Sequence, residues 1–397
     1  MKIAEIGFES FFTWNNRPKI LYSPGVRSEL AFEMNKLGGH RVALFTDRGI
    51  VDAGVAEMVS EEIRNSNLEL AGVFDKIVQD ARIDIINEGA AFYRECQADC
   101  MVVVGGGSVM DTAKAINIMI GDGVDDFQPL ARQGALWDDV NVLPPQIVFP
   151  TTAGTGSEVT YAMVILDVEA GVKLAATHPL NADVAMLDPE LTLKVPAKVT
   201  AFTGMDALTH AIEGVTSTTA EPISDALGLH AIRLIFQSLP VCIREPENVQ
   251  ARGNMLIAST MAGMCFGNAM TGAVHATAHA LGGKYGIPHG LANGIMLPWV
   301  MEFNLEEGAL RYAMVAEAIG IDIRDMNPNQ AARAAVQAVR RLKEEIGLNE
   351  TLKDFGVPAD PEKLAPMVDL AGSDSQLPFN TREAGEEDIL NLYLKAI

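Results

Sequence analysis

The stretch Cys100-Met-Val-Val-Val-Gly-Gly-Gly-Ser-Val-Met-Asp-Thr-Ala-Lys-Ala-Ile-Asn117 decides the fold. It begins with a short apolar run typical of a buried strand, passes through a glycine turn and ends in a helical pattern. Glycines at a helix start let an anion approach the free N–H groups, and the helix dipole favours negative charge there. The stretch therefore predicts a β/α unit with a phosphate-binding turn. A glycine turn without a ligand remains an alternative, because the spacing is not G-x-G-x-x-G.

Apolar runs on either side of this stretch extend the same pattern. Residues Arg41–Thr46 and Gln146–Thr151 each form a short apolar run, and a helical stretch follows the first from about Gly54 to Asn65. Strands that alternate with helices predict a parallel sheet with helices on both faces.

The pattern changes after Asp188-Pro189. Strand signals fade, and helical patterns rich in Ala, Leu and Met follow, such as the one over 329–345. We therefore expect an α/β domain over residues 1–190 and an all-helical domain over 191–397. Within the second domain, the Pro-, Asp- and Gly-rich stretch 356–385 predicts a loop-rich connection before a last helix.

Composition limits the possible partners. The chain has 397 residues and a formal net charge of −22, which disfavours nucleic acid and anionic membranes. The first residues lack a signal-peptide pattern, and no apolar run approaches the roughly 18 residues of a membrane span. None of the four cysteines forms C-x-x-C, so we expect reduced thiols with packing roles in a cytoplasmic protein.

A second polar loop follows the third strand. Thr151-Thr-Ala-Gly-Thr-Gly-Ser-Glu158 supplies hydroxyls and glycines at the edge of the sheet where ligands bind in open α/β folds. Asp47 ends the first strand, where a carboxylate binds ribose hydroxyls and repels a 2′-phosphate, which favours NAD over NADP. The same residue in a purely structural role would cap the next turn. The glycine turn at 105–108 and the loop at 151–158 together predict a dinucleotide site.

Asp206, His210, His275 and His289 form a second candidate site. Asp206 and His210 are four positions apart, so a helix places both on one face. One carboxylate and three imidazoles suit Fe²⁺, Zn²⁺ or another divalent ion. Taken singly, a histidine is more often a hydrogen-bonded core residue, and an aspartate can complement a helix dipole. The prediction of a metal site therefore depends on convergence of the four side chains.

His279 lies one helical turn after His275. The pair is superficially similar to the zincin motif H-E-x-x-H, but Ala276 stands where the glutamate is required. Metalloprotease chemistry therefore lacks its general base. We expect structural or solvent roles for the remaining histidines, which are His40, His178 and His230.

These motifs resemble those of the iron-containing (group III) alcohol dehydrogenases over nearly the whole chain. The segments that carry the resemblance are 105–114, 150–158, 187–192, 204–213 and 275–298. The resemblance implies α/β plus all-α architecture of the dehydroquinate synthase-like type. An N-terminal Rossmann-like domain binds the dinucleotide, and a C-terminal all-helical domain holds the metal on its side of a cleft.

The resemblance also implies a role for individual residues. It implies metal ligation by Asp206, His210, His275 and His289, and a place for His279 near the nicotinamide and substrate. The cofactor residues that it implies are Asp47, Gly106, Gly107, Ser108, Thr151, Thr152, Thr155 and Lys173. Phe266 corresponds to an apolar position of the substrate pocket.

The chain departs from the family pattern at two points. Many members have Asn-Pro-Thr where this chain has Asp80-Ala81-Arg82, which puts one cofactor contact in doubt. A C-terminal Asn-Pro-Arg appears here as Asn380-Thr381-Arg382. We expect neither change to touch the metal or the hydride path.

The implied activity is reversible, metal-dependent hydride transfer between NAD and a small primary alcohol, diol or hydroxy acid. His279 would relay the proton, and Fe²⁺, Zn²⁺ or another divalent ion would act as the Lewis acid. The main alternative is a lyase or hydrolase that uses NAD and a metal on the same fold, and a second is a non-catalytic binding protein. We expect a small-molecule alcohol or aldehyde as substrate, no nucleic-acid or membrane partner, and a homo-oligomer, a dimer or larger.

Overall fold

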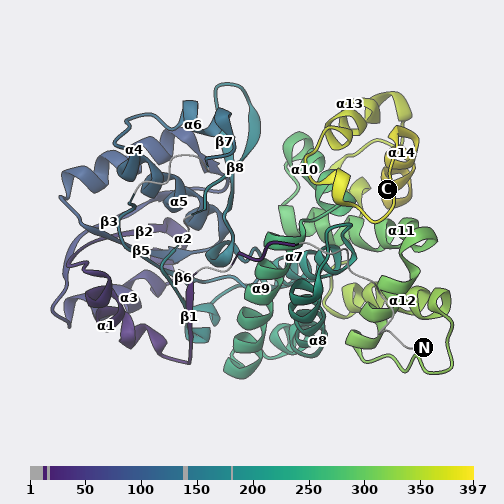
Figure 1. The fold of residues 1–397 in the computed structure, drawn as a ribbon, viewed down its shortest axis with the longest axis horizontal. Coiled ribbons are helices and arrows are strands. Elements are labelled where there is room, and N and C mark those ends of the chain that lie inside the picture. Colours follow the sequence, from purple (N-terminus) through teal and green to yellow (C-terminus); the bar gives the residue numbers. More distant parts are fainter. Residues whose placement is uncertain (1–11, 16–17, 137–141, 180–181) are drawn as a thin grey trace. The chain divides into compact units, whose positions relative to one another are not determined.

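The structure is a computed structural model that describes residues 12–15, 18–136, 142–179 and 182–397. The chain forms two compact units. One is Asn16–Val195, and the other combines Pro196–Ile397 with Met1–Asn15. The last strand among the described residues ends at Leu187. The long helices of the second unit begin with α7 at Ala197, which Figure 1 labels. The predicted fold class, α/β followed by all-α, is confirmed.

The described part of Asn16–Val195 contains a sheet of six parallel strands in the order β1-β9-β6-β5-β2-β3. Its strands are β1 (Lys19–Tyr22), β2 (Arg41–Asp47), β3 (Glu69–Ile77), β5 (Cys100–Gly105), β6 (Gln146–Pro150) and β9 (Val184–Leu187). The α-helices of this unit are α1 (Leu30–Leu37), α2 (Arg48–Asp52), α3 (Val55–Arg64), α4 (Ile83–Glu95), α5 (Gly107–Asp122) and α6 (Gln128–Gln133). The strands predicted from the three apolar runs correspond to β2, β5 and β6.

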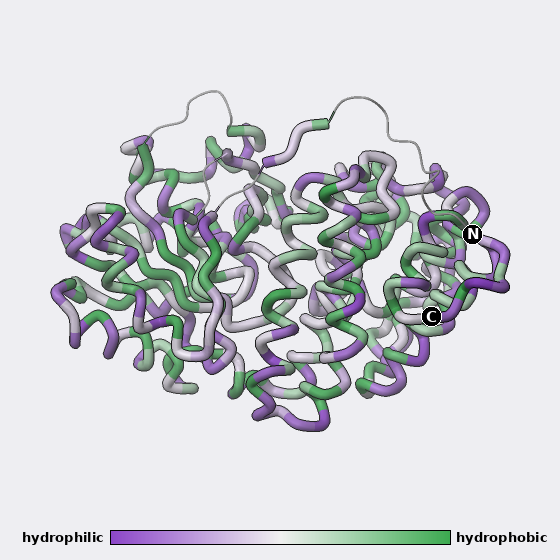
Figure 2. The backbone as a smooth tube through the Cα atoms, turned by 60° about the horizontal axis from the view of Figure 1, so that its bottom comes forward, coloured by the Kyte–Doolittle hydropathy of each residue, from purple (hydrophilic) through white to green (hydrophobic). Residues whose placement is uncertain are grey.

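Each face of this sheet has its own hydrophobic core. On one face, Phe45 of β2 joins a cluster that includes Ile86 of α4 and Ile116 of α5. On the other, Leu44 joins Met34 of α1 and Val59 of α3. Consecutive strand residues point to opposite faces, so a strand buried on both sides is apolar throughout, as the green strands of Figure 2 show. The prediction of helices on both faces is confirmed.

A small second sheet was not predicted. Strand β4 (Ala81–Arg82) pairs in parallel with β7 (Ala162–Asp167), which pairs antiparallel with β8 (Val172–Thr177). Asp167 accepts hydrogen bonds from the N–H groups of the turn after β7, and Gly171 has a φ of 67°, which favours glycine. The apolar run over residues 162–166, ended by Asp167 and followed by Gly171, was the available sequence signal for this hairpin.

The helical unit consists of long helices joined by short connections. They are α7 (Ala197–Thr216), α8 (Pro222–Arg244), α9 (Val249–Ala269), α10 (Ala273–Tyr285), α11 (His289–Ile319), α12 (Pro328–Glu345), α13 (Pro361–Gly372) and α14 (Glu386–Ala396). The prediction of a loop-rich stretch over 356–385 is wrong in part, because α13 lies within it. Asp360 caps this helix by accepting a hydrogen bond from the N–H of Glu362, and Pro361 occupies the first position.

Helix α8 is, within the described residues, long and apolar enough by length and composition to cross a membrane. From the sequence we expected no segment of this kind. Its Asp225 is buried and forms an ion pair of 2.5 Å with Arg311 of α11. A buried charge paired with a neighbouring helix is a feature of a core helix. Core helices can be as long and as apolar as a membrane span, so these two properties alone do not identify one.

Candidate metal centre and nucleotide loops

Four donor side chains meet within the helical unit. Asp206 and His210 lie on α7, His275 lies on α10, and His289 is the first residue of α11. One potential ligand atom of each side chain lies within 4.8 Å of the others. The His289 side chain is 39% exposed, whereas the other three residues are buried. The structure therefore brings together the four residues predicted as metal ligands.

Close backbone packing brings His289 to the other donors. Pro288 has extended backbone angles and precedes the first turn of α11. A Cβ atom on Gly290 would lie 2.4 Å from the carbonyl oxygen of Phe202, so this turn packs directly on the backbone of α7. The Nε2 atom of His289 consequently lies 3.5 Å from Oδ1 of Asp206.

The donor set fits a divalent cation. Burial, followed by the neighbouring imidazoles of His210, His289 and His279, holds the pKa of His275 well below its usual range. His275 is therefore a neutral imidazole with a lone pair to offer, and its ring stacks on that of His210 with 4.6 Å between centroids. A carboxylate beside neutral imidazoles suits Fe²⁺ and Zn²⁺ alike.

An amide group faces the same donor atoms. The Nδ2 group of Asn293 donates a hydrogen bond of 2.8 Å to Oδ1 of Asp206 and lies 3.2 Å from Nε2 of both His275 and His289. Its Oδ1 atom is buried and has no hydrogen-bond partner among the described residues. Asn293 lies one turn after His289 on α11. This four-residue spacing is a signal in the sequence that could have pointed to Asn293.

Carboxyl groups hold the histidines of α10 at their Nδ1 atoms. Nδ1 of His275 lies 2.5 Å from Oε2 of Glu213, and Nδ1 of His279 lies 2.8 Å from Oδ2 of Asp374. Burial raises the pKa of Glu213 to about 8, against the effect of backbone N–H donors. Burial of Asp374 raises its pKa, but the hydrogen bond and charge of His279, together with the N–H of Gln376 and the charge of His289, lower the pKa overall.

His279 is the more accessible member of this pair of histidines. Its side chain is 31% exposed, and its ring stacks on His289 with 5.4 Å between centroids. Because Asp374 occupies Nδ1, Nε2 is the nitrogen left for proton exchange. No motif in the sequence pointed to Asp374, which lies in a loop 95 residues after His279.

Phe266 contacts a predicted metal ligand. Its ring stacks on His210 with 4.1 Å between centroids and 16° between planes. This contact supports the imidazole of His210. The role of Phe266 in a substrate pocket stays a prediction.

The two polar loops of the α/β unit contact each other. They follow β5 and β6, which are neighbours in the sheet. A Cβ atom on Gly106 would lie 3.0 Å from Oγ1 of Thr152, and one on Gly107 would lie 2.7 Å from Cγ2 of Thr155. The Oγ1 atom of Thr151 is buried without a hydrogen-bond partner in the described part of the chain. The glycine turn opens the 16-residue helix α5. A helix start of the kind that can bind an anion therefore lies close to the hydroxyl of Thr151.

Asp47 ends β2, which adjoins β5 on the side away from β6. Its Oδ1 accepts a hydrogen bond of 2.9 Å from the N–H of Ile50, so the residue caps α2. Asp47 therefore has the capping role that we weighed as the alternative to a ribose contact. A ribose contact through the other oxygen stays a prediction.

The family models divide the chain between them. Iron-containing alcohol dehydrogenase matches residues 17–189, and the C-terminal part of the Fe-containing alcohol dehydrogenase family matches residues 200–397. The 1,3-propanediol dehydrogenase of Klebsiella pneumoniae is 37% identical over 378 residues, which cover 94% of this chain and 96% of that protein.

The chain belongs to the iron-containing alcohol dehydrogenase family.

Solved structures of the iron-containing alcohol dehydrogenases share this fold. A crystal structure of 1,3-propanediol oxidoreductase superposes with a TM-score of 0.92 at 35% identity, covering 98% of this chain and 100% of that one. The sulfoacetaldehyde reductase of Bifidobacterium kashiwanohense in complex with NAD⁺ gives 0.86 at 30% identity, covering 98% and 99%.

One departure from the pattern of the iron-containing alcohol dehydrogenases involves predicted cofactor residues. Asp80 has a φ of 61°, and its N–H donates a 3.1 Å hydrogen bond to Oγ of Ser108. Its carboxylate pairs with Nζ of Lys173 at 2.7 Å. In this chain Asp80 thus joins Ser108 to Lys173.

The other departure contacts α7 and α10, two of the helices that carry the candidate metal ligands. Oδ1 of Asn380 accepts a hydrogen bond of 3.3 Å from the N–H of Ala273, the first residue of α10. Thr381, at the position of the usual proline, donates through Oγ1 to the carbonyl of Thr216 on α7. The segment supports the helices that hold the donors.

Replacing Gly290 with alanine should weaken metal binding. The added methyl group would push the first turn of α11 away from Phe202 and move His289 away from Asp206. We expect Zn²⁺ affinity to fall about tenfold or more, as when the surroundings of a ligand are disturbed, and stability to fall by about 1–3 kcal/mol. Competition with a chromophoric chelator and thermal melting measure the two effects.

Gly283→Ala is the matched control. Gly283 also lies in a helix of this unit, and an added Cβ would meet nothing within 4 Å. This variant should keep parental affinity and gain up to about 1 kcal/mol from helix propensity. Equal Zn²⁺ affinity in both variants would contradict the packing argument.

Proposed function

We propose that this protein is an NAD-linked, metal-dependent alcohol dehydrogenase. It interconverts a small primary alcohol, diol or hydroxy acid and the matching carbonyl compound. The observation that carries the proposal is the convergence of Asp206, His210, His275 and His289 within 4.8 Å. The contacting glycine and threonine loops of the other unit and membership of the family support it.

Side chains and backbone groups of this chain fit both a divalent cation and NAD. A divalent cation held by the four donors would supply Lewis-acid polarisation of the substrate oxygen. NAD would supply the hydride acceptor or donor. The free N–H groups at the start of α5 would bind its phosphates, and the buried hydroxyl of Thr151 would supply a further hydrogen bond. Iron is the ion in the name of the family, and the donor chemistry admits zinc.

His279 is the proposed proton carrier. Asp374 holds its Nδ1 atom and favours the orientation that leaves Nε2 free. Partial exposure of the His279 side chain allows exchange with water, whereas the buried His275 is suited to a fixed ligand role. Oxidation of an alcohol releases a proton, and this side chain is placed to pass it on.

The decisive experiment is a panel of primary alcohols, diols, hydroxy acids and their carbonyl partners. After loading with Fe²⁺ or Zn²⁺, each is assayed with NAD⁺ or NADH by nicotinamide absorbance. The proposal requires reversible turnover that a chelator abolishes. Elimination or hydrolysis without any change in nicotinamide absorbance would instead support the lyase or hydrolase alternative.

Asp47→Gly should shift cofactor preference toward NADP. Removal of a carboxylate near a 2′-phosphate relieves a like-charge contact worth a few kcal/mol, so we expect the NADP/NAD ratio of kcat/KM to rise roughly tenfold or more. Asp47→Asn keeps the cap on α2 and removes only the charge, so it should produce a similar shift. An unchanged ratio in both variants would leave Asp47 as a helix cap alone.

His279→Ala should lower kcat by about 10²–10⁴-fold, the usual contribution of a general acid or base. Metal content should remain, because His279 is not among the four converging donors. The control is His230→Ala on α8, which removes an exposed histidine that is not among the four converging donors. Parental kcat in His279→Ala would exclude the proton-carrier role.

A further inference from the structure

Glu213 places a carboxyl group deep inside the helical unit. It lies on α7, three residues after His210 and seven after Asp206, and the residue is only 5% exposed. These spacings put all three residues on one face of the helix. A buried carboxyl group is costly unless it is hydrogen-bonded, so its partners show what it does there.

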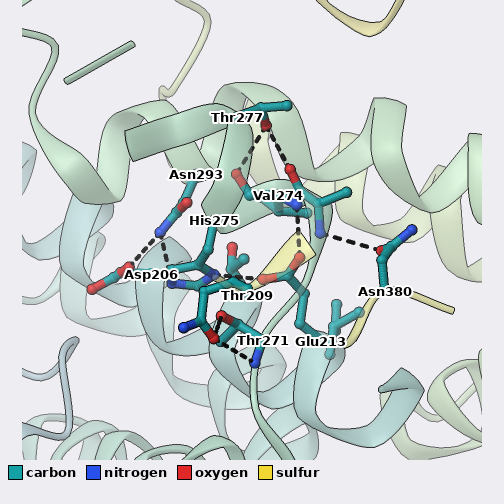
Figure 3. Close-up of polar contacts among 12 residues, drawn as sticks. Asp206, Thr209, Glu213, Thr271, Val274, His275, Thr277, Asn293 and Asn380 are labelled. Atoms are coloured by element: carbon teal, nitrogen blue, oxygen red, sulfur yellow. Dashed lines mark hydrogen bonds and ion pairs between the residues drawn. The ribbon is translucent and has the colours of Figure 1, made fainter. Parts of the chain in front are cut away.

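The first partner is the start of α10. Gly272 precedes this helix and has no side chain to cap it. Oε1 of Glu213 accepts a hydrogen bond of 2.7 Å from the N–H of Val274 instead (Figure 3). Free N–H groups at a helix start favour negative charge, so the Glu213 side chain caps α10 from α7.

The second partner is His275, through the other oxygen. Nδ1 of His275 lies 2.5 Å from Oε2 of Glu213, as the dashed line in Figure 3 marks. When Glu213 is ionised, which a cation on the far side of the ring would favour, it accepts the hydrogen bond from Nδ1–H of His275, and the lone pair of the ring is then on Nε2. Nε2 is the atom that lies 3.2 Å from the amide of Asn293, on the side of Asp206.

Close packing leaves this carboxyl group little freedom. A Cβ atom on Gly272 would lie 3.2 Å from Oε1 of Glu213 and 2.9 Å from Oδ1 of Asn380. Asn380 is itself fixed by paired hydrogen bonds with Asn304, of 2.8 and 3.0 Å. The backbone of the turn before α10 therefore fits closely against both side chains.

We propose that Glu213 is a positioning residue for the metal centre. It holds the imidazole of His275 at Nδ1, so that Nε2 points at the cation, and it fixes the start of the helix that carries this ligand. The inference rests on the proposed function only in taking His275 as a metal ligand. A carboxylate behind a metal-bound histidine typically contributes 10–100-fold to metal affinity.

The test compares Glu213→Gln and Glu213→Leu with the parent protein in the metal-free and metal-loaded states. Zn²⁺ affinity is measured by competition with a chromophoric chelator, and ligand geometry by the visible absorption of the Co²⁺ form. Glu213→Gln keeps the shape and one acceptor, so we expect roughly tenfold weaker Zn²⁺ binding and a shifted Co²⁺ spectrum. Glu213→Leu should lose roughly 100-fold.

Thr216→Val is the matched control. Thr216 is buried on α7 one turn after Glu213, and its hydroxyl donates to the carbonyl of Ile212. This variant should lower the melting temperature of the metal-free protein and leave both the affinity and the Co²⁺ spectrum unchanged. Should Glu213→Leu fail to fold, the isosteric Glu213→Gln decides the question.

Two results would overturn the inference in different ways. Parental Zn²⁺ affinity and spectrum in folded Glu213→Gln would show that Glu213 acts only in packing. A parent protein that binds neither Zn²⁺ nor Co²⁺ would remove the metal centre itself, together with any positioning role. A failure of alcohol turnover with intact metal binding would count against the proposed function alone.

Discussion

Asp206 and Glu213 place two carboxyl groups in the interior of the helical unit, where water cannot solvate them. Each must find its partners on other helices. Glu213 finds them at the start of α10, and Asp206 finds them on α11 in Asn293 and His289. The contacts that hold these helices together are therefore the same contacts that orient the candidate ligands.

The α/β unit builds its candidate site by the opposite means. Gly106 and Gly107 have no side chains. The loop after β5 can therefore pack closely against Thr152 and Thr155 in the loop after β6. Backbone N–H groups at the start of α5 then remain accessible to an anion. One unit thus relies on paired side chains, and the other relies on backbone that no side chain covers.

Much of the fold and of the candidate metal site could be predicted from hydrophobic runs and residue spacing in the sequence. Apolar runs predicted β2, β5 and β6, and the four-residue spacing of Asp206 and His210 predicted a shared helix face. Glu213 and Asn293 obey the same helical spacing and could have been found with it. Asp374 could not, because it lies 95 residues from His279 and only the folded chain brings them together. Helix α13 was missed because Pro and Asp at a helix start also occur in loops.

Helix α10 carries His275 and His279 one turn apart, each held at Nδ1 by a carboxyl group from elsewhere in the chain. Their separation is set by the helix, in which four residues rise by about 6 Å, and the two ring centroids lie 5.9 Å apart. Replacing one divalent ion by another at this candidate centre would change the Lewis acid, whereas the helix would keep the spacing of the two imidazoles. Metal-substituted forms of this protein would therefore allow the effect of Lewis acidity on rate to be compared with this spacing unchanged.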